Sequence, residues 1–247
     1  ILIGRYDSIS YELAIAELSI GIAIGVAAIS ISFASSFIVI AAAQAIARQP
    51  LFAPKILTFM LISQSIVEAP VIFTFVIALL IKANISPLLT MPQSIKLAVA
   101  GIAMAIGCIG PSIGQGLFAY SACTAVGTNK DAYNKLFPFS LLNEAIIETP
   151  MIFCVLFAIL IIYTPIAASA DITSVIKFIV AALTISIAAV ASSTGMGYVG
   201  SRSCKQIALD PTIYPSMVRS TLLAVAFIES SMIYALIVGL LMFLKVG

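Results

Sequence analysis

The stretch NEAIIETPMIFCVLFAILIIY (143–163) is almost unbroken hydrocarbon from Ala145 onward, yet it carries Glu148 near its start. About 20 apolar residues are enough to cross a bilayer as a helix, so the stretch predicts a membrane span. An ionisable side chain inside such a span costs about 2.5–3.5 kcal/mol on insertion scales. Glu148 is therefore a candidate functional residue.

The composition of the whole chain predicts a multi-pass membrane protein. Of the 247 residues, 62% are hydrophobic and 9% are charged, with a mean hydropathy of +1.20. Soluble domains carry about 25% charged residues. The chain has no histidine and no basic run, which excludes a histidine metal site, a Ser-His triad and nucleic-acid binding. Four cysteines stand alone in apolar stretches and are interpreted as small packing residues, so no metal or cofactor is predicted: Cys108, Cys123, Cys154 and Cys204. The acidic N-terminal region does not match the n-region of a signal peptide.

The sequence repeats itself three times. A shift of 80 residues places SIVEAPVIFTFVIALLI (65–81) over AIIETPMIFCVLFAILI (145–161), and a further shift of 81 reaches AFIESSMIYALIVGLLM (226–242). The same offsets superpose Ser30, Gly110 and Ala191. Such self-similarity indicates one structural unit in three copies. We expect hairpin repeats over residues 1–83, 84–164 and 165–247.

Each repeat reads as two apolar segments joined by a short polar loop. The loops are expected at 47–55, 127–135 and 209–215, and Pro-bearing links between hairpins at 82–92 and 163–171. Six membrane helices result, with both termini on one side. Seven Lys and Arg residues lie near the hairpin loops (48, 55, 130, 135, 202, 205, 219) and five on the other side (5, 82, 96, 177, 245). This bias places the hairpin loops in the cytoplasm or matrix.

The first helix of each repeat carries small residues at every second position. They are Ser30, Ser32, Ala34 and Ser36; then Gly110, Ser112, Gly114 and Gly116; then Ala191, Ser193, Gly195 and Gly197. Residues i and i+4 share a face of a helix, whereas i+2 lies nearly opposite, so two opposite flanks lack bulk. A helix with a close neighbour on each side, as in a closed ring, needs this pattern. The second helices are rich in large apolar residues and suit an outer layer facing lipid. Links of about ten residues span at most about 35 Å, so consecutive hairpins are expected to be neighbours.

One carboxyl group recurs in the outer helix of all three repeats: Glu68, Glu148 and Glu229. No Lys or Arg lies at matching depth, because the basic residues cluster near loops and helix ends. Desolvation disfavours the charged form of a carboxyl group, so these groups can take up and release a proton when their surroundings change. We expect them at one depth, near the boundaries between hairpins.

Three segments of the chain resemble a known family of membrane proteins. GCIGPSIGQG (107–116), AIARQP (45–50) and FIESSMIYALIVGLLMFL (227–244) resemble the c subunit, or proteolipid, of F-type ATP synthases, over nearly the whole chain as three fused hairpins. The resemblance implies an all-α membrane protein with six transmembrane helices, part of a two-layer rotor ring, and a non-catalytic subunit of the ATP synthase complex. It implies ion binding at Glu68, Glu148 and Glu229, and contact with the central stalk through Arg48, Gln49 and Pro50. That loop sequence departs in the other repeats, which have Thr128, Asn129 and Lys130, and then only Pro211.

The implied partners are other copies of the chain in a homo-oligomeric ring, the stator a subunit, gamma- and epsilon-type stalk subunits, and membrane lipid. The implied location is a bacterial cell membrane, with a mitochondrial inner membrane as the alternative.

The transported ion is expected to be a proton. Sodium-driven members of the family use a glutamine on the inner helix, the carboxylate and a hydroxyl directly after it, and repeat two has all three in Gln115, Glu148 and Thr149. Repeat one has Ser35 and Ala69 at the supporting positions, and repeat three has Met196 and Ser230. A thioether is a poor ligand for a hard cation. Because every site in a ring must carry the same ion, protons are favoured, and a sodium-coupled ring is the alternative.

The position of Glu144 and two rival functions have alternatives that the sequence leaves open. Glu144 lies one turn before Glu148 and is expected to reach the headgroup region, with a hydrogen bond inside the site as the alternative. A vacuolar- or archaeal-type rotary ATPase proteolipid is the nearest rival, but typical fused members of that kind lose a carboxylate in one hairpin. A repeat-built secondary transporter is the more distant rival, and such transporters use broken helices around one midplane site.

Overall fold

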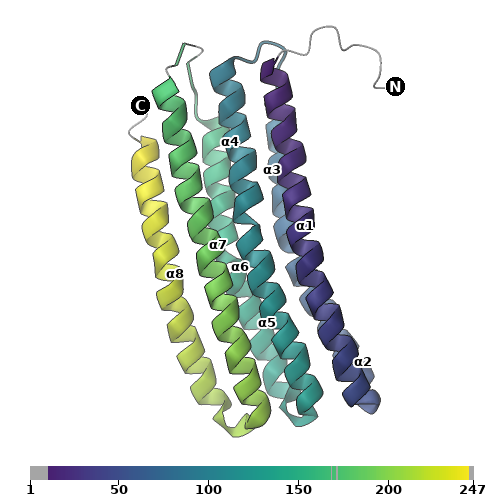
Figure 1. Ribbon diagram of the computed structural model, residues 1–247. Helices are drawn as coiled ribbons and strands as arrows, with labels where there is room; N and C mark the ends of the chain where they lie inside the picture. The colour runs from purple at the N-terminus through teal and green to yellow at the C-terminus, as the bar shows by residue number, and fades with distance from the viewer. Residues whose placement is uncertain (1–10, 168, 171, 245–247) are drawn as a thin grey trace, which may run out of the picture.

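The computed structural model describes residues 11–167, 169–170 and 172–244, and every regular element in those residues is helical (Figure 1). The helices are α1 (Tyr11–Arg48), α2 (Ala53–Val67), α3 (Ala69–Ala83), α4 (Met91–Gly107), α5 (Ile109–Thr128), α6 (Tyr133–Tyr163), α7 (Ile172–Leu209) and α8 (Tyr214–Leu244). They form six spans of 34 to 38 residues that are long and apolar enough to cross a membrane. The prediction of six spans is therefore confirmed.

The hairpin turns are tighter than expected. Each turn is a single 3₁₀ segment: η1 (Pro50–Phe52), η2 (Lys130–Ala132) and η3 (Pro211–Ile213). The expected loops at 47–55, 127–135 and 209–215 were too long, because the helices on both sides continue almost to the turn. In the second and third turns an Asx-type hydrogen bond closes the backbone: Asn129 Oδ1 accepts from the Asp131 amide at 3.0 Å, and Asp210 Oδ1 accepts from the Thr212 amide at 2.9 Å.

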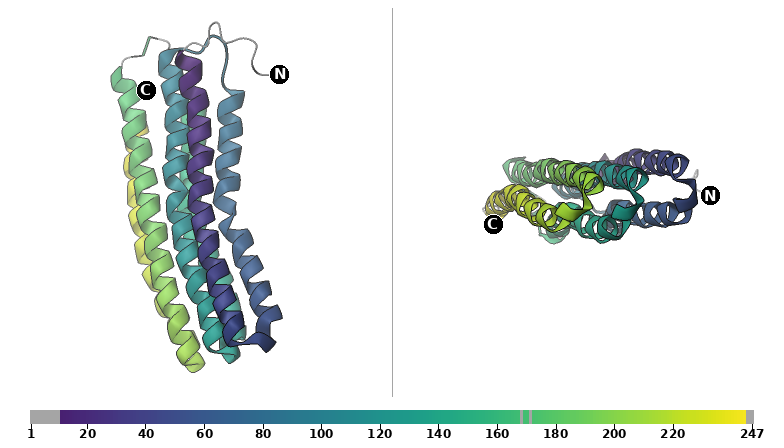
Figure 2. Two further views of the ribbon diagram at one scale, coloured as in Figure 1. Left: turned by 45° about the vertical axis from the view of Figure 1, so that its right-hand side comes forward. Right: turned by 90° about the horizontal axis from the view of Figure 1, so that it is seen from below.

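The helices stand in two curved layers, which Figure 2 shows end-on in its right-hand view. The first, or inner, layer holds α1, the α4–α5 span and α7; the second, or outer, layer holds the α2–α3 span, α6 and α8. Within the first layer the α4–α5 span lies between α1 and α7. We call α1–α3 hairpin 1, α4–α6 hairpin 2 and α7–α8 hairpin 3. They follow one another in chain order, as the short links predicted.

Small residues make the contacts of the first layer, on the two flanks that the sequence predicted. Gly116 of α5 faces Ala34 of α1, and Ser112 Oγ lies 3.4 Å from Ser30 Oγ. On the opposite flank of α5, a Cβ at Gly110 would meet the Val190 backbone of α7. A Cβ at Gly114, one turn later, would meet the Ser193 backbone. Backbones can approach this closely only without side chains between them.

Two of the six spans are interrupted, and these interruptions were not predicted from the sequence. The break between α2 and α3 falls at Glu68, two residues before Pro70, and the break between α4 and α5 falls at Cys108, three residues before Pro111. Proline has no amide hydrogen and its ring clashes with the carbonyl four residues earlier, which breaks or kinks a helix. In α6 the helix continues through Pro138 and Pro150.

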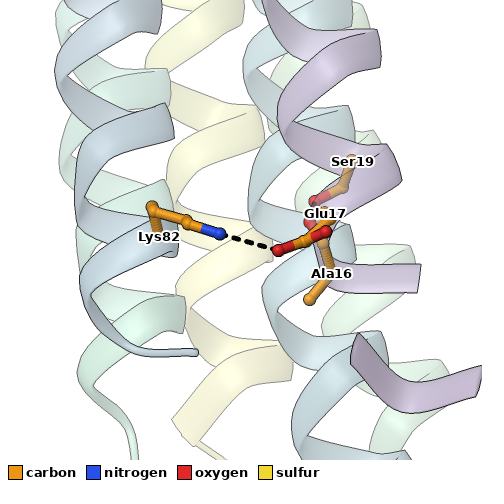
Figure 3. Close-up of polar contacts among 4 residues, drawn as sticks. All are labelled: Ala16, Glu17, Ser19 and Lys82. Carbon is orange, nitrogen blue, oxygen red and sulfur yellow. Dashed lines mark hydrogen bonds and ion pairs between the residues drawn. The ribbon is translucent and has the colours of Figure 1, made fainter. Parts of the chain in front are cut away.

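Polar contacts also occur at the end of the bundle opposite the hairpin turns. Lys82 Nζ of α3 lies 2.7 Å from Glu17 Oε1 of α1 (Figure 3). Both side chains are exposed, so the pair contributes at most about 1 kcal/mol. Lys96 is buried and donates to the carbonyls of Ile162 and Thr164, both at 2.8 Å, at the end of α6. Two basic residues in the charge count, Arg5 and Lys245, lie outside the described residues.

Candidate functional site

The three recurring carboxyl groups lie at equivalent heights on the second layer. Glu68, Glu148 and Glu229 each stand eighteen residues after the first residue of their 3₁₀ turn. At a rise of about 1.5 Å per residue, this distance is about 27 Å. It places each carboxyl group near the middle of a span of 34 residues. The three side chains belong to three different outer spans and do not converge on one central site.

The three carboxyl groups differ in exposure. Glu68 is exposed, whereas Glu148 and Glu229 are half-buried. The outer helix of hairpin 2 packs against that of hairpin 1, where the rings of Phe59 and Phe137 are 6.0 Å apart. Among the described residues, no other hairpin packs on the opposite side of hairpin 1. Its carboxyl group therefore lies on a side of the molecule that is open.

Glu68 also has a distinct backbone. It occupies the break between α2 and α3, where its amide donates to the Gln64 carbonyl at 3.3 Å and its carbonyl accepts from the Val71 amide at 3.2 Å. The backbone at Glu229 is unbroken, and Ser231 stands there at the position equivalent to Pro70. The three sites therefore share a position in the fold but not a local geometry.

The residues that were expected to support the carboxyl groups do not form one set of ligands around Glu148. Gln115 is fully buried, and its Nε2 donates to the backbone carbonyl of Glu144 at 3.2 Å, while its Oε1 has no partner in the described residues. Thr149 is half-buried on α6. In hairpin 3, Ser230 Oγ donates to the Phe227 carbonyl of its own helix at 2.7 Å.

The expectation that Glu144 reaches the headgroup region is wrong. Its side chain is fully buried, and within the described residues both of its carboxyl oxygens lack a hydrogen-bond partner. One helical turn moves a residue only about 5.4 Å along the span, which does not bring it out of the hydrocarbon region. Ser63 of hairpin 1 lies beside the Glu144 carboxyl group, so the neighbouring hairpin covers it.

The expected stalk-contacting residues lie at the first hairpin turn. Arg48 ends α1, Gln49 precedes η1 and Pro50 begins it. Arg48 and Pro50 are exposed, but Gln49 is half-buried, and its Nε2 donates to the Gly127 carbonyl of hairpin 2 at 2.9 Å. These residues line one side of an open pocket of about 610 Å³, and Thr128, Asn129 and Lys130 line the other. The hydrogen bond from Gln49 to hairpin 2 was not predicted, although the repeat alignment superposes two side-chain amides, Gln49 and Asn129.

The four cysteines are free and buried, in agreement with a packing role. No group of three or more His, Cys, Asp or Glu side chains that could hold a metal ion occurs in the residues that the structure describes.

Comparison with known proteins identifies the repeat. A family model for the C subunit of ATP synthase matches this chain three times, over residues 18–81, 98–161 and 179–242. The chain is 39% identical over 69 residues to the ATP synthase c subunit of Dehalococcoides mccartyi (strain CBDB1), which covers 28% of this chain and 91% of the relative. It is 34% identical over 76 residues to the ATP synthase c subunit of Mycoplasma capricolum subsp. capricolum, covering 31% of this chain and 74% of the relative. Three tandem matches cover most of the sequence, and the chain belongs to the family of ATP synthase C subunits.

Proposed function

We propose that this chain is the ion-translocating rotor subunit of an F-type ATP synthase, with three hairpins fused in tandem. In this proposal Glu68, Glu148 and Glu229 take up protons at the interface with the stator, carry them through the lipid and release them. The observation that carries the proposal is the recurrence of one mid-span carboxyl group in each of the three family matches. The membrane potential contributes about 2.3 kcal/mol per charge and per 100 mV, summed over several ions per ATP.

The proposed partners follow from membership of the family. They are further copies of the chain in a ring, the stator a subunit, gamma- and epsilon-type stalk subunits, and lipid. The proposed stalk contact is the first turn, through Arg48 and Pro50, because these residues are exposed. The proposed functional units are residues 1–83, 84–164 and 165–247, and the proposed location is a bacterial cell membrane, with a mitochondrial inner membrane as the alternative.

Protons are the proposed ion because the oxygen ligands around the three carboxyl groups are unequal. The amide of Gln115 is engaged with the Glu144 carbonyl, and Ser230 donates its hydroxyl to its own helix. Met196 takes the position of the inner-helix glutamine in hairpin 3 and has no oxygen to offer. A proton needs only the carboxyl group itself, which all three hairpins have.

The test is ATP-driven proton uptake into vesicles that contain the complete complex. Glu68→Gln, Glu148→Gln and Glu229→Gln are each expected to abolish or severely reduce proton uptake, because every site must pass the stator in each turn. Membrane insertion, checked by the amount of chain extracted from the membrane, is expected to stay at the parent level. Proton uptake at the parent rate in any one variant would contradict the equivalence of the three sites.

The ion is tested by carbodiimide labelling of the carboxyl groups. The labelling rate is expected to fall as the pH rises, because the protonated acid gives its proton to a carbodiimide nitrogen before its oxygen adds to the carbodiimide carbon. Sodium is expected to protect little. Strong protection by millimolar sodium would contradict proton transport and favour the sodium-coupled alternative.

A further inference from the structure

Equivalent side chains join neighbouring hairpins at the turn end of the bundle. Gln49 Nε2 of hairpin 1 donates to the Gly127 carbonyl of hairpin 2 at 2.9 Å. Asn129 Nδ2 of hairpin 2 donates to the Ala208 carbonyl of hairpin 3, also at 2.9 Å. The repeat offsets of 80 and 81 superpose Gln49 on Asn129 and Gly127 on Ala208. The same hydrogen bond is therefore made twice, each time from one hairpin to the next.

The third equivalent position breaks this pattern. It is occupied by Asp210, whose carboxylate cannot donate to a carbonyl group. Its Oδ1 accepts from the amide of Thr212 at 2.9 Å and from the Thr212 hydroxyl at 2.6 Å. These hydrogen bonds from Thr212 lower the pKa of Asp210 below its ordinary value, which keeps it ionised at neutral pH. Because Asp and Asn have the same shape, the second carboxylate oxygen takes the place of the Asn129 amide nitrogen.

The inner layer has an open flank at each end. Ser32 and Ser36 of α1 are exposed, whereas Ser30 and Ala34, on the opposite flank of the same helix, are buried against α5. On α7, Ala191 is exposed and Gly195 is half-buried, whereas Ser193 and Gly197 face α5. The open flanks carry the same alternation of small residues as the filled ones.

Glycines without close neighbours lie on these open flanks. Among the described glycines, a Cβ at Gly21 or Gly25 would meet nothing within 4 Å. At Gly195 it would come no closer than 3.5 Å to Ile228. At each of the other described glycines, an added Cβ would come within 3.0 Å of another residue. Glycine costs about 0.5–1 kcal/mol relative to alanine in a helix. Packing within one chain therefore does not explain these three.

The repeat offsets predict which residues would be in contact if hairpin 1 of a second copy followed hairpin 3 of the first. The contact of Ala34 with Gly116 recurs between Gly114 and Gly197, and its next equivalent joins Gly195 to Ser36 of another copy. The contact of Ser19 with Gly101 corresponds to Val99 with Ala182 at the second junction, and then to Val180, which is exposed, with Gly21 of another copy. A large side chain and a glycine would thus face each other. At the turn, Asp210 would face the end of α1, where Arg48 stands at the position equivalent to Thr128.

We propose that, where α7 of one copy lies against α1 of the next copy along these flanks, an ion pair between Asp210 and Arg48 of the next copy replaces the amide hydrogen bond of the two internal junctions. This inference rests on the proposed assembly of copies into a ring. Arg48 is exposed and makes no ion pair among the residues that the structure describes. Lys135 also lies near Asp210, but it belongs to hairpin 2 and its Nζ donates to the Pro211 carbonyl at 2.7 Å. The chain-to-chain junction would thus be the charged one, sensitive to salt, while the junctions within the chain are neutral.

Cross-linking of the full-length chain in membranes tests the docking. One variant carries Asp210→Cys and Arg48→Cys and is treated with a short bis-maleimide, which reaches the turns from water. A second carries Ser36→Cys and Gly195→Cys and is oxidised to form disulfides between the helix flanks. The native cysteines are buried and provide the background. Both variants are expected to give a ladder of multiples of the 25.9 kDa chain on a denaturing gel, and each single-cysteine variant none.

The outcomes separate the possible failures. A ladder from positions 36 and 195 without one from 48 and 210 would overturn the ion pair and leave the helix contact. No ladder from either pair would overturn the docking, even if the glutamate variants lose proton uptake as proposed above. Ladders from both pairs, together with unimpaired proton uptake by the glutamate variants, would keep the docking and reject the proposed proton carriage.

Charge reversal tests the ion pair itself. Arg48→Glu is expected to raise the fraction of free chain in mild detergent several-fold at low salt, and adding Asp210→Lys is expected to restore the parent fraction. Lys130→Glu changes the same charge at an internal turn and is the matched control, with no expected effect. Asp210→Asn is expected to keep the oligomer but remove its salt sensitivity, because it recreates the Asn129 junction. Equal effects of Arg48→Glu and Lys130→Glu, or no restoration by Asp210→Lys, would overturn the pair.

Discussion

Two carboxyl groups on α6 illustrate how strongly the surroundings of a residue decide its role. Glu148 is half-buried and recurs in every repeat, whereas Glu144, one turn away, is fully buried and occurs once. The recurrence of Glu148 was visible in the sequence because it repeats at a fixed offset. The burial of Glu144 was not, because it depends on Ser63 of another hairpin, and the pattern of one helix says nothing about its neighbour.

Replacing Glu144 by glutamine is expected to leave proton uptake within about twofold of the parent and to leave stability unchanged or higher. A buried polar group without a partner costs about 1–3 kcal/mol, and more when it is charged. Glutamine has nearly the same shape and is always neutral. Proton uptake in vesicles and the midpoint of thermal unfolding in detergent would be compared with those of Glu148→Gln. A loss of uptake as severe as that of Glu148→Gln would show that Glu144 takes part in transport.

At the scale of the helices, the sequence predicted the number of spans and the flanks on which they pack, but it did not predict where two spans are interrupted. The 80- and 81-residue repeats identified six spans, and the alternation of small residues correctly placed Gly114 and Gly116 on opposite sides of α5. The breaks at Glu68 and Cys108 were missed. Pro70 and Pro111 are visible in the sequence, but α6 continues through Pro150. A proline in a membrane helix therefore does not determine by itself whether the helix ends, because neighbouring groups can satisfy the freed carbonyl.

The close approach of α5 and α7 predicts an unequal pair of glycine variants. Gly197→Ala is expected to destabilise the chain by about 1–3 kcal/mol, because the new methyl group would overlap the Gly114 backbone, which cannot move without separating the helices. Gly239→Ala is the matched control, since its methyl group would come nearest the terminal atoms of the Ile185 side chain, which can rotate away. Thermal unfolding in the same detergent measures both. Equal losses would mean that the inner layer adjusts its spacing easily.

At the scale of the whole molecule, the hairpins are held side by side by packing as well as by the chain. Ser30 and Ser112, Gly116 and Ala34, and Gln49 and Gly127 join hairpin 1 to hairpin 2 along its length. Helix association in lipid relies on such close van der Waals packing and on hydrogen bonds, because lipid tails are as apolar as the helices. The link between α3 and α4 adds only residues 84–90. The relative from Dehalococcoides mccartyi (strain CBDB1) matches 28% of this chain with 91% of its own length, about one hairpin.

Cutting the link between hairpins 1 and 2 is therefore expected to leave the assembly intact. Leu88 is 88% exposed and lies in the link, outside both α3 and α4. A protease site can be inserted after it, because lengthening a surface loop costs little stability. After cleavage in mild detergent, a denaturing gel should show two fragments, while size-exclusion chromatography should show one species of the parent size. The same cleaved sample, unfolded and returned to detergent, is the control for association after the cut. If hairpin 1 separates in mild detergent, the covalent link, rather than the contacts of the inner layer, holds the hairpins in order.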